Sequence, residues 1–328
     1  MKIGKVPESV LKRSILRQIH TKREEVLIGA GVGEDCAILA LADDEVFVVS
    51  TDPVTGTTKD AGALAVQITA NDLASSGAEP VAVLVSALLP EEITEPQIRE
   101  LMAQTEEACA ALHIQIAGGH TEITKAVNQP ILTVTGIGKA KRDRIITTKG
   151  ARAGQDVVVS KWIGLEGTSI LAKEKEEELL TKYPSHLIEE AKAFDRFLSI
   201  VPEAATAGKS GVTAMHDITE GGIFGALWEL AESSGVGLEI DLKRIPIRQE
   251  TVEVCEFFGL NPYELISSGS LLMVTDDGLD LVRRLAAEHI PAAVIGKIRE
   301  GNDRVVINEE ERRFLEPPKT DELYKVTG

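Results

Sequence analysis

The residues best suited to chemistry begin with two glycines followed by a carboxylate, Gly31-x-Gly33-x-Asp35. Glycines let the backbone approach a ligand without a Cβ atom in the way, and carboxylate oxygens are ligands that Mg²⁺ prefers. A second acidic segment, Thr51-Asp52, follows a short apolar run. Together these residues predict half of a nucleotide site. The alternative is an ordinary turn in which the Asp caps a backbone group or faces solvent.

A further carboxylate, Asp72, follows Asn71 near the end of an expected helix over residues 60–76. Asn and Asp have low helix propensity, and an acid at a helix C-terminus opposes the helix dipole. We therefore expect an additional partner for Asp72, either a bound cation or simply the water around a solvated acidic face.

The run Gly118-Gly119-His120-Thr121 combines a flexible backbone with an imidazole and a hydroxyl. Backbone N–H groups freed by glycines, together with these side chains, suit contacts with phosphates or their metal. The alternative for His120 is a loop or packing histidine.

The second half of the chain has its own candidate motif, in which Asp217 and Thr219 precede Gly221 and Gly222 at the start of an expected helix over residues 223–233. A helix N-terminus offers free N–H groups and positive potential to an anion. Asp217 and Thr219 are also residue types that cap helices, and both roles are compatible.

These residues require two sets of elements to position them. In the first half we expect a helix over 7–20, a β-hairpin from strands 36–41 and 46–50, a helix over 60–76, a strand over 81–89, a helix over 94–112, and strands over 114–117 and 131–137. In the second half we expect strands over 156–160, 240–247, 271–274 and 293–298, with helices over 165–180, 186–207, 223–233, 250–258 and 279–288. The composition becomes charged and glycine-containing over 143–155, which places a boundary near Gly150. The pattern predicts an α+β chain of two α/β sandwich domains, residues 1–150 and 151–328.

Composition narrows the classes of function. The chain has 328 residues, 43% of them hydrophobic, which is enough for two cores. Its net charge of −17 disfavours nucleic acid as a partner. Three scattered cysteines indicate neither a disulfide framework nor a zinc site and fit the cytoplasm. No apolar run approaches the length of a membrane helix, so we expect no membrane partner.

Taken together, five motifs in one order resemble the aminoimidazole ribonucleotide (AIR) synthase superfamily: Gly31-x-Gly-x-Asp35-x-Ala37, Ser50-Thr51-Asp52, Asn71-Asp72-Leu73-Ala74-Ser75-Ser76-Gly77-Ala78-Glu79-Pro80, Gly118-Gly119-His120-Thr121 and Asp217-Ile-Thr-Glu-Gly-Gly222. The resemblance implies an N-terminal domain whose strands form a dimeric β-barrel with a second copy, followed by a C-terminal α/β domain. It also implies ATP and Mg²⁺ as cofactors. Asp35, Asp72 and Asp217 look like the metal ligands. The residues that look like nucleotide contacts are Gly31, Gly33, Thr51, Asp52, Gly118, Gly119, His120, Thr121, Thr219, Gly221 and Gly222.

Within that superfamily, residues 212–222, 231–237 and 255–262 are similar to the hydrogenase-maturation branch, whose members convert a thiocarboxamide to a nitrile. This implies a possible protein partner in maturation. Two features depart from that branch. The printed sequence stops at Tyr324-Lys-Val-Thr-Gly328 rather than at a Pro-Arg-x-Cys-like tail, which removes the expected substrate-carrying thiolate. Glu220 replaces the branch's usual arginine and reverses the local charge.

Three functional hypotheses follow from the resemblance. The first is an Mg-ATP-dependent enzyme that phosphorylates or activates an amide or acyl oxygen of a small molecule or of a group delivered by a partner protein. The second is a nucleotide-binding maturation or regulatory partner without turnover. The third is a small-molecule kinase similar to thiamine-monophosphate kinase, although only 4% of the residues are aromatic and could stack on its substrate's ring.

Overall fold

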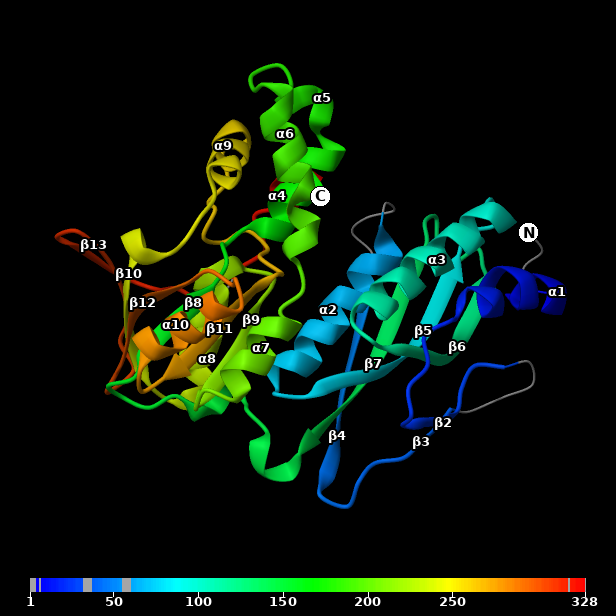
Figure 1. The fold of residues 1–328 in the computed structure, drawn as a ribbon. Coiled ribbons are helices and arrows are strands. Elements are labelled where there is room, and N and C mark those ends of the chain that lie inside the picture. Colours follow the sequence, from blue (N-terminus) through cyan, green and yellow to red (C-terminus); the bar gives the residue numbers. More distant parts are fainter. Residues whose placement is uncertain (1–3, 6, 32–36, 55–59, 318, 328) are drawn as a thin grey trace. The chain divides into compact units, whose positions relative to one another are not determined.

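The computed structural model describes residues 4–5, 7–31, 37–54, 60–317 and 319–327. It divides into two compact units, residues 1–74 with 78–145 and residues 75–77 with 146–328. We call them the N-terminal and the C-terminal unit. Figure 1 shows the elements of each. No helix in the described part of the chain is both long and apolar enough to span a bilayer.

The N-terminal unit is built on a mixed sheet with the described strand order β1-β6-β5-β7-β4. These strands are β1 (Gly4–Lys5), β4 (Glu45–Val54), β5 (Glu79–Leu89), β6 (Gln115–Ile123) and β7 (Ile131–Lys141). Only β5 and β6 pair in parallel among these neighbours, and the other pairs are antiparallel. The nearly continuous apolar sequence of β5 suits its central place, where most of its side chains are buried.

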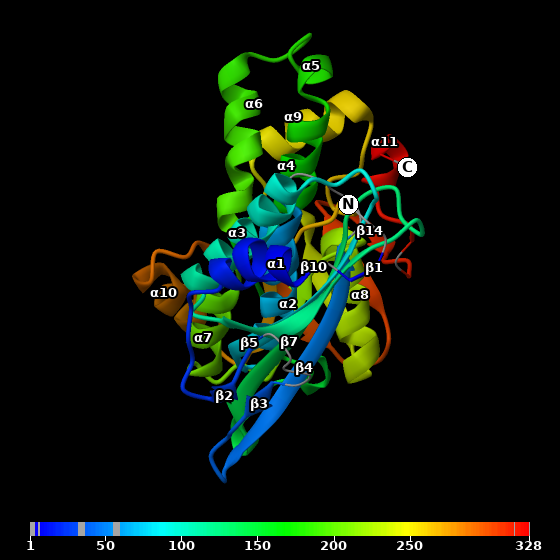
Figure 2. The same ribbon diagram turned by 90° about the vertical axis from the view of Figure 1, so that its right-hand side faces the viewer.

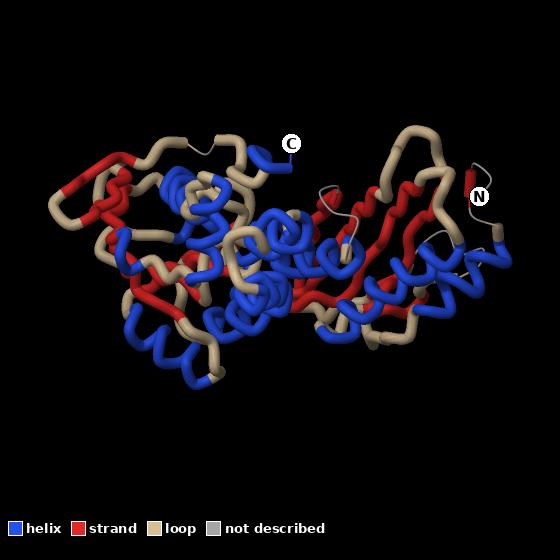
Figure 3. The backbone as a smooth tube through the Cα atoms, turned by 90° about the horizontal axis from the view of Figure 1, so that it is seen from above, coloured by secondary structure: helices blue, strands red, loops and turns tan. Residues whose placement is uncertain are grey.

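Two helices cover one face of this sheet, α2 (Ala61–Ser75) and α3 (Glu95–Ala111), as the view from above shows (Figure 3). Gly136 of β7 lies under α2, because a Cβ atom there would come within 2.4 Å of Thr69. Thr94 and Gln97 form a capping box at the start of α3, in which the Thr94 side chain accepts from the Gln97 backbone and the Thr94 N–H donates to Gln97 Oε1 at 2.9 Å.

The N-terminal segment departs from the single expected helix. It forms a short turn of α1 (Glu8–Val10), a π-helical turn (Leu11–Ile15) and a 3₁₀ turn (Leu16–Gln18). The segment is therefore helical over much of the expected range but irregular in its hydrogen bonding.

The predicted hairpin between strands 36–41 and 46–50 is wrong. Within the described residues, β3 (Ile38–Leu39) pairs with β2 (Val26–Ile28), whereas β4 pairs along its whole length with β7. The long β7 strand offers ten paired positions, and a local turn at residues 42–44 cannot compete with that many ladder hydrogen bonds.

The C-terminal unit contains a mixed sheet with the described order β14-β13-β10-β12-β8-β11-β9, in which only β10 and β13 pair in parallel. The strands are β8 (Asp156–Ser160), β9 (Ala214–Ile218), β10 (Gly237–Asp241), β11 (Ser270–Thr275), β12 (Ala292–Arg299), β13 (Arg304–Asn308) and β14 (Glu311–Phe314). The sequence analysis assigned no strand to β13, which contains the apolar run Val305-Val306-Ile307, or to β14, whose residues are mostly charged.

The helices of this unit are α4 (Leu165–Glu174), α5 (Glu176–Leu179), α6 (Ser185–Lys192), α7 (Val201–Gly208), α8 (Gly222–Ser234), α9 (Gln249–Phe258), α10 (Gly278–Ala287) and α11 (Tyr324–Thr327). Leu171 of α4, Ile188 of α6 and Val254 of α9 share a buried cluster, and these helices lie together in both side views (Figures 1 and 2).

The single helix expected over 186–207 is wrong. A 3₁₀ turn (Ala193–Phe197) interrupts it, and a new helix, α7, begins at Val201 with Pro202 in its first turn, where the N–H that proline lacks has no helical partner.

Candidate functional site

Two predicted carboxylates come together in the N-terminal unit through the hydroxyl of Ser50. Ser50 Oγ lies 2.5 Å from Asp72 Oδ2, to which it donates, and 3.2 Å from Asp52 Oδ2. Asp72 comes from α2, while Ser50 and Asp52 come from β4, where residues two apart point to the same face. Sequence analysis did not name Ser50 as a site residue, but this alternation could have identified it.

Thr51 points to the opposite face of β4 from Ser50 and Asp52. Its hydroxyl lies 2.9 Å from the hydroxyl of Thr135 on β7. The same face carries Phe47 and Val49, which are 49% and 61% exposed. Strand alternation therefore sends the neighbouring predicted residues Thr51 and Asp52 into different environments.

The run Gly118–Thr121, which follows the strand expected over 114–117, is itself part of the longer strand β6 (Gln115–Ile123). A register shift beside Val83 and Leu84 places a bulge at the start of this run. Gly119 has φ +147°, and a Cβ atom on it would lie 2.0 Å from the carbonyl oxygen of Val85. The glycine is thus required by the fold of β6, whether or not its backbone also meets a ligand.

His120 extends from β6 into partly exposed surroundings. Its Nε2 lies 3.3 Å from Glu122 Oε2, two residues further along the strand. Thr121 follows in the same strand and is partly exposed. Both side chains are therefore reachable by a ligand in the N-terminal unit.

The strand register places Gly118 and Gly119 in the same rows of paired residues, running across the strands, as Thr51 and Asp52. Across the sheet, Thr51 lies opposite Thr135, which lies opposite Leu84, which pairs with Gly118. The corresponding row for Asp52 ends at Gly119. Three strand spacings separate the ends of each row, about 14 Å. The two motifs share a level in the sheet, but they do not form one compact cluster.

The first predicted motif is only partly described. Gly31 is a partly exposed residue outside any regular element. Gly33 and Asp35 lie outside the described residues.

Asp217 lies in β9 of the C-terminal unit, opposite Leu271 of β11. Beside it, His216 Nδ1 is 3.8 Å from Asp217 Oδ1, and His216 Nε2 is 2.9 Å from Glu229 Oε2. Burial opposes protonation of His216, but the hydrogen bond to Glu229 and the two negative charges raise its pKa overall. The carboxylate of Asp217 therefore lies beside an imidazole whose protonated form is favoured by its acidic neighbours.

Gly221 and Gly222 form the N-terminus of α8 with left-handed backbones. The Gly221 N–H donates to Asp321 Oδ2 at 2.7 Å, so a carboxylate of the chain itself already lies at this helix end. The Thr219 carbonyl accepts the N–H groups of Gly222 and Ser267. The alternative of side-chain caps from Asp217 and Thr219 is wrong, because the N-cap is Gly221 and its bond goes to Asp321.

Two further acidic residues belong to this helix end: Glu220, to which the sequence analysis gave no role, and Glu166, which it did not mention. Glu220 accepts a hydrogen bond from the Tyr324 hydroxyl at 2.7 Å, which together with burial raises the pKa of Tyr324 to about 12. Glu166, at the start of α4, is only 3% exposed, and burial raises its pKa to about 7. Nothing in the local sequence distinguishes Glu166 from the many solvated acids of this chain.

Over the part of the chain that the structure describes, no three His, Cys, Asp or Glu side chains are grouped as a metal site. Asp72 belongs to the N-terminal unit and Asp217 to the C-terminal unit. The convergence of Asp35, Asp72 and Asp217 on one ion remains a prediction.

Two family models match the chain: the N-terminal domain of AIR synthase related protein over residues 33–140, and its C-terminal domain over residues 152–308. Carbamoyl dehydratase HypE of Rhodobacter capsulatus is 30% identical over 278 residues, which cover 83% of this chain and 78% of that protein. The chain belongs to the AIR synthase related family. Among family relatives, a hydrogenase expression/formation protein of Methanocaldococcus jannaschii is 28% identical and covers 98% of this chain and 97% of its own length.

Solved structures of the family share the fold. Escherichia coli HypE matches with a TM-score of 0.81 and 22% identity, covering 97% of this chain and 99% of that one. HypE in complex with ATP matches with a TM-score of 0.77 and 20% identity, and the match covers 96% of this chain and 95% of that one. Thiamine-monophosphate kinase of Stenotrophomonas maltophilia matches with a TM-score of 0.75 and 22% identity, and the match covers 94% of this chain and 98% of that one. These likenesses show a mixed α/β fold of two domains, as the motifs implied.

Proposed function

We propose that this family member is a magnesium- and ATP-dependent enzyme that phosphorylates or activates an amide or acyl oxygen of a small molecule or of a partner-delivered group. The observation that carries the proposal is the contact of Ser50 with both Asp52 and Asp72. Two carboxylates brought within hydrogen-bond distance of one hydroxyl are more than a solvated acidic face requires. The similarity to carbamoyl dehydratase HypE, crystallised with ATP in one relative, supports the nucleotide.

The donor set in the N-terminal unit fits Mg²⁺. Asp52 and Asp72 supply carboxylate oxygens, and Ser50 supplies a hydroxyl, all hard oxygen ligands of the kind that Mg²⁺ takes. We propose that Asp35 and Asp217 join Asp72 as ligands. When bound, the ion would neutralise phosphate charge. The protein's own contribution is to orient these carboxylates before the nucleotide arrives.

As nucleotide contacts we propose the residues that the family motifs indicate in the two units. They are Gly31, Gly33, Thr51, Asp52, Gly118, Gly119, His120, Thr121, Thr219, Gly221 and Gly222. The separation of about 14 Å between the β4 and β6 motifs means that one nucleotide meets both only if it spans the sheet or lies between two copies of the chain.

A homodimer through the N-terminal units fits the open face of the sheet. Phe47 and Val49 are exposed there, and they border a hollow of about 400 Å³ that Ala37, Leu39, Thr135 and Ile137 also line. A second copy would bury this apolar surface and could complete a β-barrel. Thr51 lies on the same face, so dimerisation would bring a predicted nucleotide contact to the interface.

We also propose a domain boundary near Gly150, giving domains 1–150 and 151–328, and a protein partner in maturation. The partner is supported by a solved HypE–HypF complex, which matches this chain with a TM-score of 0.71 and 20% identity. The boundary is supported by the gap between the two family models, residues 141–151.

Isothermal titration calorimetry with ATP, in the presence and absence of magnesium, tests the proposal. The wild-type chain should bind ATP in a magnesium-dependent manner. Asp72→Asn should weaken that binding at least about tenfold, because outer-sphere changes alone cost this much at metal sites. Asp143→Asn, an exposed acid of the same unit, is the matched control and should bind like wild type. Equal binding by wild type and Asp72→Asn would rule out the proposed metal site.

Turnover separates the competing functions. Steady ATP hydrolysis stimulated by carbamoyl or amide compounds supports the enzyme, whereas tight binding without hydrolysis, alone or with a maturation partner, identifies a non-catalytic nucleotide-binding protein. Phosphoryl transfer to thiamine monophosphate would instead identify a kinase like the structural relatives.

A further inference from the structure

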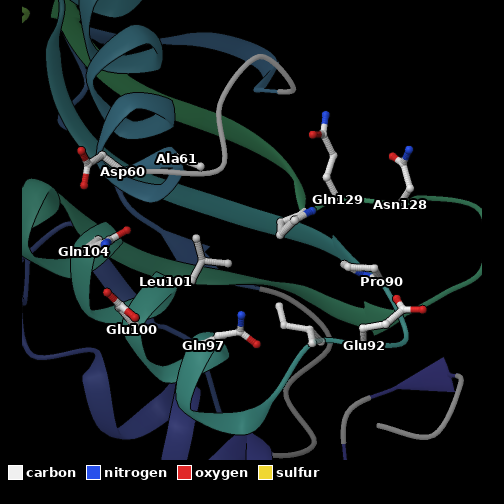
Figure 4. Close-up of a pocket in the computed structure, with 12 residues that line it drawn as sticks. Asp60, Ala61, Pro90, Glu92, Gln97, Glu100, Leu101, Gln104, Asn128 and Gln129 are labelled. Atoms are coloured by element: carbon white, nitrogen blue, oxygen red, sulfur yellow. The ribbon is translucent and has the colours of Figure 1, made fainter. Parts of the chain in front are cut away.

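A cavity of about 540 Å³ opens on the N-terminal unit between the start of α2, the first half of α3 and the segments that follow β5 and precede β7 (Figure 4). Its described lining is Asp60, Ala61, Pro90, Glu92, Ile93, Gln97, Glu100, Leu101, Gln104, Asn128, Gln129 and Pro130. The volume lies within the range of about 300–1,000 Å³ that small-molecule sites occupy. None of these residues belongs to the proposed nucleotide site.

The lining divides into an apolar part and a polar part. Leu101 lies near the middle of the hollow, with Ala61 and Ile93 also contributing apolar atoms. In Figure 4, Gln104 stands on the α3 side of the hollow and Gln129 stands across from it. A ligand with an aliphatic portion could pack on Leu101 while its polar groups reach the carboxamides around it.

Three carboxylates determine the sign of the charge in this cavity. Asp60, Glu92 and Glu100 line it, and the described lining contains no Lys, Arg or His. The nearby cations Arg99 and Lys125 face other acids, Glu95 and Glu91. In the described part of the chain, Glu92 and Glu100 have no ion-pair partner within 4 Å. The described part of the chain therefore does not compensate their charges.

The charge excludes two other classes of ligand. The N-terminus of α2 also opens here, but a helix end carries only about half a positive charge, which cannot outweigh three carboxylates for an anion. A chelated metal ion is disfavoured, since the described carboxylates are not grouped closely enough to hold one. The class of ligand that the lining favours is an organic cation, large enough for its N–H groups to donate to several of the carboxylates and carboxamides at once.

One rim residue is already held in place. Gln97 Oε1 accepts hydrogen bonds from the Thr94 N–H and hydroxyl in the capping box of α3. Glu100, Leu101 and Gln104 follow Gln97 at spacings of three, four and seven residues, which places all four on one face of the helix. The rigid helix α3 therefore presents carboxamide, carboxylate and apolar groups together.

We propose that this cavity binds a small organic cation, an amine or guanidinium on a short aliphatic stem. The stem packs on Leu101, and the N–H donors pair with Glu92, Glu100 and the surrounding carboxamide oxygens. This site is independent of the proposed ATP chemistry, so either can fail without the other.

The test uses agmatine, which carries an amine and a guanidinium on a four-carbon stem, against 1,4-butanediol, which has the stem without the charge. Titration followed by calorimetry or by NMR shifts of the full-length chain should show agmatine binding and no comparable butanediol binding. The double variant Glu92→Gln/Glu100→Gln should weaken agmatine binding at least tenfold. The control Glu107→Gln changes an exposed acid of α3 outside the cavity lining and should leave binding unchanged.

Both acids are exposed, so the variants should fold, and matching thermal melts would establish that they do. The proposal is overturned if agmatine fails to bind at millimolar concentration, if butanediol binds equally well, or if the double variant keeps wild-type affinity.

Discussion

Ser50 and Asp72 are joined by a hydrogen bond of 2.5 Å that connects strand β4 to helix α2. Ser50 also lies 3.2 Å from Asp52, so one hydroxyl touches two carboxylates. Since a hydroxyl has one proton to donate, it holds one acid firmly and leaves the other with capacity to bind a cation. This arrangement leads to the first prediction.

Ser50→Ala should weaken magnesium-dependent ATP binding about tenfold or more, because Asp72 loses the group that orients it. Ser50→Thr retains a hydroxyl and should restore most of the affinity. Calorimetry with and without magnesium measures both variants. If Ser50→Ala binds ATP as tightly as wild type, Ser50 has no role in positioning these carboxylates.

Gly119→Ala should destabilise the N-terminal unit by about 2–4 kcal/mol, since it combines a positive φ with a severe clash against the backbone. The Cβ atom would lie 2.0 Å from the Val85 carbonyl oxygen, which cannot rotate away. Gly118→Ala is the matched control, because its Cβ would meet only the flexible end of Leu84 at 3.2 Å. Urea unfolding checks the pair, and equal stabilities would contradict the structure of β6.

Glu166 should make the chain less stable as pH rises. Burial raises its pKa from 4.5 to about 7 in the folded chain. Between these values the folded state keeps a proton that the unfolded state has lost, so stability falls as pH rises from about 4.5 to about 7. The full difference corresponds to about 3 kcal/mol.

Glu166→Gln carries no ionisable group and should remove this part of the pH dependence. Its unfolding free energy should exceed that of wild type at pH 8 and approach it at pH 5, as chemical denaturation at several pH values can measure. A parallel pH profile in both proteins would show that Glu166 is ionised normally in the folded chain.

Phe47→Asp should dissociate a dimer formed through the open face of the N-terminal sheet, because it places a charge at the centre of an apolar contact. Leu279→Asp changes a residue that is 69% exposed on α10 and should leave the oligomeric state unchanged. Light scattering coupled to size exclusion distinguishes the two. A monomeric wild-type chain, or a Phe47→Asp variant that stays dimeric, would remove this interface.

Several elements could be predicted because their signals are local. The capping box at Thr94 and Gln97 and the apolar run of β5 specify their own helix and strand, and both are present. The pairing of β4 could not be predicted in this way. Its partner β7 lies far along the chain, and only the folded sheet shows that long-range pairing outcompetes the nearby turn.

The sequence by itself determined the family, through five short motifs in one order, and the residue types that a nucleotide and a metal ion would require. The backbone freedom of a glycine and the ability of a carboxylate to bind a cation are properties of the residue type itself, so the sequence alone shows them. Only the tertiary structure decided that Ser50 links Asp52 to Asp72, that Thr51 faces the other way, and that Asp321 lies at the Gly221 end of α8. These relationships depend on strand register and on segments far apart in the chain, and a linear pattern carries no information about either.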